Sequence, residues 1–268
     1  MNYLEVIILG IIEGLTEFLP ISSTGHLILG VKFLGIEQSI FIELFEIFIQ
    51  LGAIFAVVLL RWNKIQTTIL NISKPQSKKF ALSVIIATVP AALAGLFFAK
   101  WFKAYFFNPW SVSITLIIGG IIILLVDRPS KHNLNNNIKD VDDIDNVTAL
   151  KIGLMQCLAL IPGTSRSGAT IIGAMILGVP RVTATEFSFF LAIPIIFGAS
   201  LHDLYKSRHL LTLDSIYLLM LGSFISFITA WLCIKWLIKY VSSHNFVNFA
   251  WYRIIFGIIL LLTLKFIY

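Results

Sequence analysis

Two carboxylates near the start of the chain are spaced as a pair of metal ligands would be. Glu13 and Glu17 are four residues apart, so on a helix they share one face. In a low dielectric two such charges repel each other, and one takes up a proton unless a cation lies between them. A hard divalent cation such as Mg²⁺ or Ca²⁺ accepts one or two carboxylates together with the phosphates of a ligand. The spacing therefore predicts a cation site with Glu13 and Glu17 as ligands.

The residues that follow could hold phosphate and supply a nucleophile. Pro20 ends the first helical run, and hydroxyls and backbone N–H groups at the start of a new half-helix form a cradle for phosphate oxygens. His26 could deprotonate a hydroxyl, with Glu17 orienting its imidazole. A histidine at a broken helix is more often a structural hydrogen-bond donor, but the neighbouring acids favour catalysis. The cradle residues are Ser22, Ser23, Thr24 and Gly25.

A second stretch carries a single arginine among hydroxyls. Arg166 lies in an otherwise apolar segment, and an arginine at membrane depth must find an anion. Its planar guanidinium suits a phosphate and could neutralise the charge that develops in phosphoryl transfer. The alternative is a salt bridge to Glu13 or Glu17 that locks the two halves, and ligand phosphate could displace that bridge. The other predicted phosphate contacts here are Ser165, Ser167, Gly168 and Thr170.

The two stretches are variants of one pattern. Residues 10–30 return at residues 153–173, shifted by 143 positions without a gap, and Glu13 faces Gln156. Each copy is an apolar run broken by proline and glycine. Non-helical backbone in a membrane is tolerated only where protein covers it or where it lines a wet cavity. One such segment would indicate a kinked packing helix, whereas two matched segments with acids, histidine and arginine predict a shared polar chamber.

The composition indicates an integral membrane protein. The chain is 58% hydrophobic and 13% charged with a mean hydropathy of +0.92, which excludes a soluble domain of 268 residues. A spanning helix needs about 20 apolar residues. Tyr3–Leu19 and Lys151–Ile161 are too short or too interrupted to span simply. Six runs reach or nearly reach this length: Phe41–Leu60, Phe80–Ala99, Ser111–Val126, Glu186–Tyr205, Ser215–Trp236 and Phe249–Tyr268.

An inverted repeat follows from this count. The expected fold is all-α, with six spanning helices and two broken, re-entrant helix pairs. Residues 1–126 form the first repeat, residues 127–150 a polar, flexible cytoplasmic linker, and residues 151–268 the second repeat. Because each repeat crosses three times, the second enters from the opposite side, which brings the two broken segments together near the midplane.

The basic residues orient the chain. With the N-terminus outside, the outer loops hold Lys32, Lys100, Lys103, Lys206, Arg208 and Lys265. The inner loops hold Arg61, Lys64, Lys74, Lys78, Lys79, Arg128, Lys131, Lys139, Lys151, Arg181, Lys235, Lys239 and Arg253. This excess follows the positive-inside rule and explains the net charge of +6 without nucleic acid. The start lacks a basic region and a cleavage site, so no removable signal peptide is expected.

The motifs resemble those of a known family. Glu13-Gly-Leu-Thr-Glu-Phe-Leu-Pro-Ile-Ser-Ser-Thr-Gly-His26 and Pro162-Gly-Thr-Ser-Arg-Ser-Gly-Ala-Thr170 are similar to the two signature motifs of the bacitracin-resistance type of undecaprenyl-diphosphate phosphatase. Phe45 to Gly52 and Glu186 to Pro194 resemble further stretches of it. Glu46, Gln50 and Glu186 are expected to support the broken loops by hydrogen bonds.

The resemblance implies a multi-pass enzyme of the bacterial plasma membrane. It would remove one phosphate from undecaprenyl diphosphate at the outer face with a divalent cation, recycle the lipid carrier for wall synthesis and confer bacitracin resistance. Glu13, Glu17, His26 and Arg166 match the family's essential residues, and Ser23 its proposed nucleophile. Ser22, Thr24, Ser165, Ser167 and Thr170 would line the diphosphate pocket. The residues leave open whether Ser23, His26 or water attacks phosphorus. A homodimer is a further expectation.

Two other functions compete with this one. Inverted repeats with broken helices are also a transporter architecture, so a carrier for polyprenyl phosphate is the alternative. Carboxylates with His, Ser and Arg favour hydrolysis, because transport needs no nucleophile. The other large class of membrane phosphatases requires a His/Asp pair soon after its Ser-Arg motif, and here no histidine follows Arg166 before His202.

Overall fold

The spanning helices form as the hydropathy predicts. The computed structural model describes residues 1–127 and 138–267, and every regular element in them is helical. The six described helices long and apolar enough to cross a membrane are α3 (Ile40–Leu60), α5 (Pro75–Phe106), α6 (Pro109–Val126), α9 (Arg181–Lys206), α10 (Leu213–Val241) and α11 (Val247–Ile267). The shorter elements are α1 (Tyr3–Thr16), α2 (Ser23–Phe33), α4 (Trp62–Leu70), η1 (Val141–Asp143), α7 (Asn146–Gln156), η2 (Cys157–Leu160), α8 (Arg166–Ile176) and η3 (Arg208–Leu210). The predicted all-α membrane fold with six spans is confirmed.

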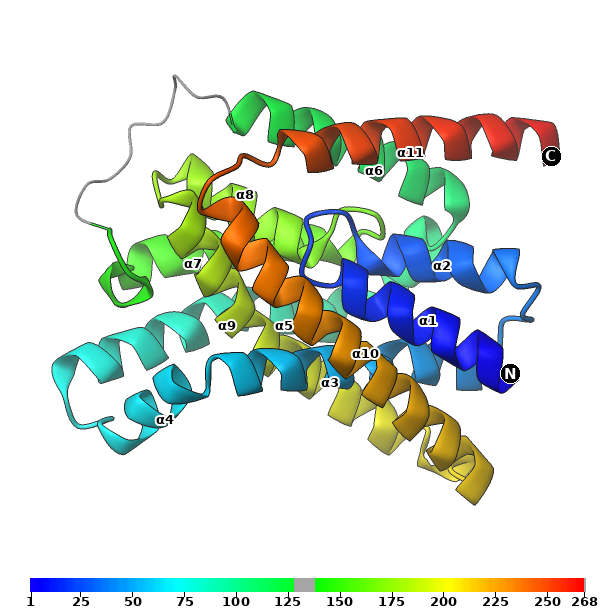
Figure 1. The fold of residues 1–268 in the computed structure, drawn as a ribbon, viewed down its shortest axis with the longest axis horizontal. Helices are drawn as coiled ribbons and strands as arrows, with labels where there is room; N and C mark the ends of the chain where they lie inside the picture. The colour runs from blue at the N-terminus through cyan, green and yellow to red at the C-terminus, as the bar shows by residue number, and fades with distance from the viewer. Residues whose placement is uncertain (128–137, 268) are drawn as a thin grey trace.

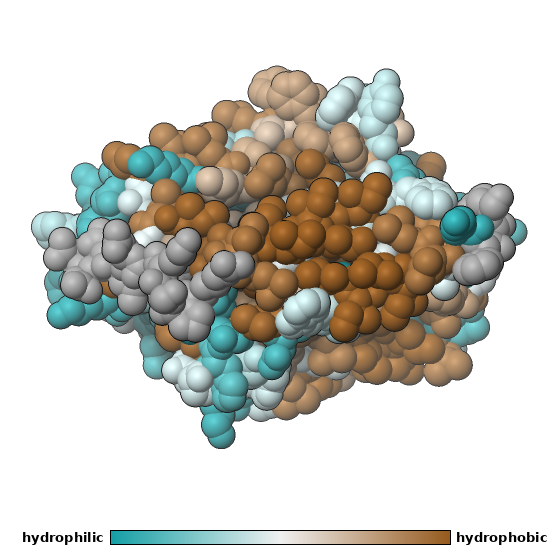
Figure 2. Space-filling model, turned by 90° about the horizontal axis from the view of Figure 1, so that it is seen from above, coloured by the Kyte–Doolittle hydropathy of each residue, from teal (hydrophilic) through white to brown (hydrophobic). Residues whose placement is uncertain are grey.

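The outer surface suits lipid rather than water. Figure 2 shows a broad hydrophobic band over the face that α6 and α11 form in Figure 1, with hydrophilic residues gathered towards its two ends. Large apolar side chains of these two helices, such as Ile118 and Ile255, are about half exposed. An apolar surface this wide on a monomer marks a contact with membrane or protein. The band and the six spans make the chain a multi-pass membrane protein.

Each half of the chain contains one broken helix pair, as the repeat predicts. α1 ends before Pro20 and α2 follows, while α7 and η2 end before Pro162 and α8 follows. Ser22 and Ser165 occupy matching repeat positions, and both adopt a φ of 74°, a region that residues other than glycine rarely enter. Each serine caps the next helix, because its Oγ accepts a hydrogen bond from the N–H of Gly25 or Gly168. The sequence repeat is therefore also a backbone repeat.

The two halves interlock. α1 of the first half packs against α10 of the second, and α7 of the second half packs in the corresponding way against α5 of the first. Likewise α3 packs against α10, and α9 against α5. Figure 1 shows both termini at one end of the molecule and α4 at the other, as an even number of crossings requires. Equivalent helices of the two halves therefore make equivalent contacts, and the exact division into repeats stays a prediction.

Residues 138–150 differ from the flexible linker that their polarity predicts. Apolar residues spaced three apart are buried among the acids of this segment, and they are Ile138, Val141 and Ile144. Asp142 forms an ion pair with Lys64 of α4, and α7 already begins at Asn146. Three apolar anchors and one ion pair are enough to attach a polar segment to the helices below it. Arg128, Lys131 and the rest of residues 128–137 lie outside the described residues.

A strong cap starts α7 at the end of this segment. The side chain of Asp145 accepts hydrogen bonds from the backbone N–H groups of Val147 at 2.8 Å and Thr148 at 2.9 Å. The bond from Thr148 in particular lowers the pKa of Asp145 below its usual value. The carboxylate therefore remains charged at the positive end of the α7 dipole, where it stabilises the helix that leads to the second break.

Glycine permits the closest approach of two spanning helices. A Cβ on Gly52 of α3 would lie 1.9 Å from the backbone oxygen of Ser223 of α10. Gly52→Ala is therefore expected to push the helices apart and lower the free energy of unfolding by about 2–3 kcal/mol, measured by thermal unfolding in detergent. Gly198→Ala in α9 is the matched control, because its added methyl meets nothing within 4 Å. Equal melting temperatures for the two variants would contradict this packing.

Candidate active site

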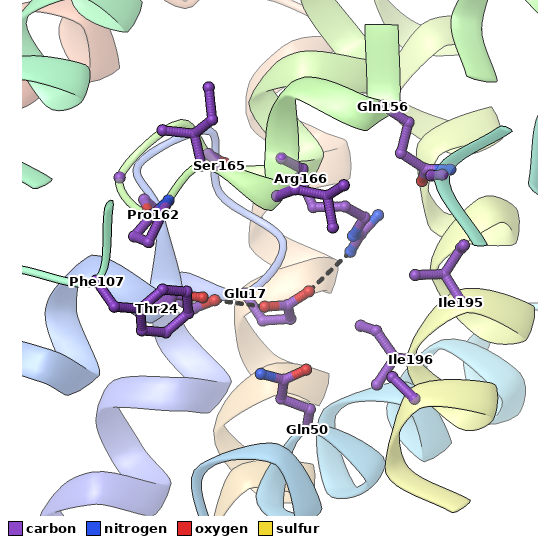
Figure 3. Close-up of a pocket in the computed structure, with 18 residues that line it drawn as sticks. Glu17, Thr24, Gln50, Phe107, Gln156, Pro162, Ser165, Arg166, Ile195 and Ile196 are labelled. Atoms are coloured by element: carbon purple, nitrogen blue, oxygen red, sulfur yellow. Dashed lines mark hydrogen bonds and ion pairs between the residues drawn. The ribbon is translucent and has the colours of Figure 1, made fainter. Parts of the chain in front are cut away.

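A cavity of about 190 Å³ forms where the two broken segments meet. Six of the predicted site residues line it: Glu17, Ser22, Ser23, Thr24, Ser165 and Arg166. The other walls come from α3, α5 and α9, from Gln156 at the end of α7, from η2 and the residues after it, and from Phe107 in the connection between α5 and α6. Figure 3 shows Glu17 at the centre, between Thr24 on one side and Arg166 on the other. The predicted shared chamber therefore exists.

Glu17 joins the two halves of this cavity. The hydroxyl of Ser23 donates a hydrogen bond to Oε2 of Glu17 at 2.5 Å, and Nη2 of Arg166 donates to Oε1 at 3.0 Å. Glu17 is only 6% exposed, so its charge is compensated by the arginine rather than by bulk water. The predicted salt bridge is thus present, with Glu17 rather than Glu13 as its acid. The same carboxylate is placed to take the proton of the Ser23 hydroxyl.

Arg166 is fixed from a second side by α9. Its Nη1 donates to the backbone oxygen of Ser188 at 2.9 Å, and the Ser188 hydroxyl lies 2.7 Å from that of Thr170. The guanidinium also lies 5.8 Å from the ring centroid of Phe18, within the range of a cation–π contact. These contacts hold the planar group in one orientation. Ser188 was not predicted as a site residue, although it follows Glu186 in a stretch that resembles the family.

The hydroxyls of Ser167 and Thr170 bind backbone oxygens outside the cavity and so stabilise the broken segments. Ser167 donates to the backbone oxygen of Leu19 at 2.8 Å, which ties the second break to the first. Thr170 donates to the backbone oxygen of Arg166. Neither side chain lines the cavity, and neither do Gly25 and Gly168. Their direct contact with a ligand stays a prediction, and their observed contacts are structural.

His26 lies outside the cavity and is held by the other half of the chain. Its Nδ1 lies 2.7 Å from the backbone oxygen of Ser22, and its Nε2 lies 2.7 Å from the hydroxyl of Tyr252. The ring stacks on Phe256 at 4.9 Å. The expectation that Glu17 orients this imidazole is therefore wrong, because Ser22 and Tyr252 occupy both ring nitrogens. A catalytic role for His26 stays a prediction.

Glu13 lies behind Glu17 and is fully buried. Neither of its carboxylate oxygens accepts a hydrogen bond from the described residues, and the charges of Glu17 and Glu46 act on it. An acid so placed needs a proton or a cation. The described residues contain no cluster of three His, Cys, Asp or Glu side chains that could hold a metal alone. The pair of hard carboxylates fits a divalent cation that takes its other ligands from phosphate.

Arg253 is the main structural residue that the sequence interpretation misplaced. It lies within α11, 1% exposed, rather than in an inner loop. All five of its N–H groups donate to backbone carbonyls, at 2.9–3.2 Å. The acceptors are Pro20 of the first break, Gly163 and Thr164 of the second, and Thr115 and Leu116 of α6. A lone arginine inside the predicted span Phe249–Tyr268 was the signal for such a role.

Without this guanidinium, the two broken segments are expected to lose their attachment to α11 and to each other. Arg253→Met keeps much of the length of the side chain but removes all five hydrogen bonds of the guanidinium, three of them to carbonyls in the broken segments, so the free energy of unfolding should fall by about 3 kcal/mol or more. The measurement is thermal unfolding of the purified protein in detergent. Trp251→Leu, on an exposed face of the same helix, serves as the control and should change little. Equal stability of both variants would show that the breaks hold without Arg253.

Glu186 and Gln50, which were expected to support the broken loops, have other positions in the structure. Glu186 does not support a broken loop but forms an ion pair at 2.5 Å with Arg61, one of the basic residues that the charge count assigns to the inner side. Gln50 lines the cavity. The partner of Glu186 lies 125 residues away in the chain, so no local pattern could reveal the pair.

Comparison with known proteins identifies the family. A family model described as "Bacitracin resistance protein BacA" matches residues 6–259. The chain belongs to this family. Relatives named "Undecaprenyl-diphosphatase" support the match, with 51% identity over 262 residues in Polaromonas sp. (97% of this chain, 94% of the relative). One from Acidovorax ebreus is 51% identical over 261 residues (97% and 94%), and one from Variovorax paradoxus is 52% identical over 257 residues (96% and 93%). The resemblance of the motifs to this family is confirmed.

Proposed function

We propose that this BacA-family protein hydrolyses undecaprenyl diphosphate to undecaprenyl phosphate and inorganic phosphate. One observation carries the proposal: α2 and α8 both begin at the cavity that holds Ser23, Glu17 and Arg166. The positive ends of two helix dipoles and one guanidinium thus meet at one cavity, where they would bind an anion. The names of the relatives point to the same reaction. Through recycling of the wall-lipid carrier, this activity would confer bacitracin resistance.

A lipid diphosphate fits this cavity better than a soluble one. Apart from the polar residues, much of its lining is apolar and comes from Ala91, Phe107, Leu160, Ile195, Ile196 and Ala199. The diphosphate would lie against Arg166 and the hydroxyls, with the first prenyl units along the apolar wall. The rest of the tail would extend into the membrane, where its burial contributes about 0.8 kcal/mol per CH₂ group.

The geometry supports Ser23 as the nucleophile. Its oxygen forms a bond to the terminal phosphorus as the bond from phosphorus to the bridging oxygen breaks, and undecaprenyl phosphate leaves. The Ser23 proton passes to Oε2 of Glu17, which already accepts it in a hydrogen bond. Arg166 stabilises the charge on the phosphoryl oxygens. Water then attacks the phosphoserine, and inorganic phosphate leaves.

A divalent cation is part of the proposal. Glu13 and Glu17 would hold Mg²⁺ or Ca²⁺, which would neutralise charge on the diphosphate oxygens. Chelator is therefore expected to lower phosphate release at least tenfold. Added cation at 100 times its Kd should stabilise the folded protein by about 2.7 kcal/mol. Glu13→Gln should lose this stabilisation, and an unchanged thermal shift in that variant would place the cation elsewhere.

The proposed orientation opens the site to the outer face of the plasma membrane. Phe107 lies where α5 and α6 connect, at the opposite end of α5 from the basic residues Lys74, Lys78 and Lys79. The positive-inside rule puts those lysines in the cytoplasm. A homodimer remains an expectation of the sequence.

Phosphate release in detergent tests the proposed function directly. The full-length protein is purified, supplied with undecaprenyl diphosphate and Mg²⁺ or Ca²⁺, and inorganic phosphate is measured. Detergent micelles have no second compartment, so a carrier would release nothing. The carrier alternative is not favoured, because the relatives are named for hydrolysis and transport needs no Ser23–Glu17 pair. A folded protein that releases no phosphate under these conditions would refute the phosphatase.

A further inference from the structure

Gln156 presents an unused hydrogen-bond acceptor to the catalytic cavity. It is the last residue of α7 and the repeat counterpart of Glu13, but unlike Glu13 it lines the cavity. The side chain is 1% exposed. Figure 3 shows its amide group on the same side of the cavity as Arg166 and Ile195. No step described above uses this residue.

The orientation of the amide is set by a neighbouring helix. Nε2 of Gln156 donates to the backbone oxygen of Ala87 in α5 at 3.3 Å. A carbonyl can only accept, so the NH₂ group must face α5 and the amide oxygen must face the other way. Oε1 accepts no hydrogen bond from the described residues.

Because Oε1 can only accept a hydrogen bond, its ligand must be a donor. A buried acceptor without a donor costs about 1–3 kcal/mol, so a ligand that donates to it is favoured. An ionised phosphate oxygen only accepts and would be repelled by Oε1. Among the described donors near the reaction, Nη1 and Nη2 of Arg166 donate to Ser188 and Glu17, and Ser23 donates to Glu17, whereas Nε of Arg166 is unpaired but does not donate to Oε1 of Gln156. Water is the donor that the proposed reaction itself requires.

We infer that Gln156 orients the water that hydrolyses the phosphoserine. The inference rests on the proposed function and on Ser23 as nucleophile. The water oxygen forms a bond to phosphorus as the bond between phosphorus and the Ser23 oxygen breaks. Glu17 returns its proton to Ser23 and receives one proton from the water, while the second hydrogen of the water is held by Oε1 of Gln156. The products are free enzyme and inorganic phosphate, so atoms and charges balance.

Two substitutions separate this role from the contact with α5. Gln156→Met removes both polar groups with little change of shape. Gln156→Glu keeps an acceptor oxygen but loses the NH₂ group that donates to Ala87. If Gln156 only joined α7 to α5, phosphate release would fall to the same extent in both variants. If Gln156 orients water, Gln156→Met should release phosphate slowly, whereas Gln156→Glu should keep most of the wild-type rate.

The experiment follows both products of undecaprenyl diphosphate in the purified full-length enzyme. Wild type should release undecaprenyl phosphate and inorganic phosphate in step. Gln156→Met should produce a burst of about one undecaprenyl phosphate per enzyme, with phosphate retained on acid-denatured protein. Its kcat should fall about 100-fold, as expected for misplaced reactants, with kcat/KM nearly unchanged because the first step is intact. Gln156→Glu should release both products in step.

The controls distinguish failure of the proposed phosphatase function from failure of the role of Gln156. Ser23→Ala combined with Gln156→Met should retain no phosphate on the protein. Cys157 follows Gln156 in the chain but does not line the cavity, so Cys157→Ser should release both products as the wild type does. A wild-type enzyme that releases no phosphate refutes the proposed function. An active wild type with a Gln156→Met variant that shows no burst, or with a Gln156→Glu variant impaired to the same degree, overturns the role of Gln156 alone.

Discussion

Ser23→Ala is expected to lower kcat for phosphate release by about 10⁴-fold or more, because it removes the atom that attacks phosphorus. The Ser23 hydroxyl makes one hydrogen bond, to Glu17, and Ser22 rather than Ser23 caps α2. The fold should therefore survive the substitution. Phosphate release and thermal unfolding are measured on the same purified sample, so that loss of chemistry is distinguished from loss of structure.

Ser242→Ala provides the matched control for this experiment. Ser242 is exposed at the end of α10, and its hydroxyl donates only to the backbone of its own helix, at Lys239. This variant should keep full activity. If Ser23→Ala retains more than a tenth of the wild-type rate with an unchanged melting temperature, water attacks the diphosphate directly and Ser23 serves only to bind it.

Arg166→Lys is the second substitution with a large expected effect, a fall in kcat of about 10³-fold. An arginine that contacts a transferring phosphoryl group contributes about 10³–10⁵-fold to the rate, and lysine keeps the charge but not the planar fork. Lysine also cannot donate to Glu17 and Ser188 in the geometry that the guanidinium uses at 3.0 Å and 2.9 Å. Phosphate release and KM are measured together.

The comparison of rate with stability separates catalysis from a structural lock. If Arg166 only joined the two halves, the activity of Arg166→Lys would fall in proportion to its melting temperature and would recover on cooling. A catalytic arginine predicts a low kcat in a protein that remains folded. Arg208→Lys is the control, because Arg208 is exposed beyond α9 and donates to the backbone of Tyr205. It should leave both the rate and the stability unchanged.

Local patterns were sufficient for the spans, the breaks and most of the site. Hydropathy predicts a spanning helix because the requirement for apolar length acts on one segment at a time. The repeat with its prolines located both breaks. The first motif also placed Glu17 and Ser23 beside the same break, but the sequence assigned Glu17 to His26, and the hydrogen bond between Glu17 and Ser23 was found only in the structure. The pairing of Arg166 with an acid followed from the cost of an unpaired charge in an apolar segment.

Long-range contacts decided the partners of residues that the motifs alone left unplaced. His26 is held by Tyr252, which is 226 residues away, and Arg253 reaches Pro20 across 233 residues. Gln156 and Glu13 occupy equivalent repeat positions, yet only Gln156 lines the cavity. Spacing along a chain specifies which residues share a helix face, but it carries no information on which helix will pack against that face. The interlocking of the two halves supplies those partners, and with them the difference between a residue that lines the cavity and one that packs behind it.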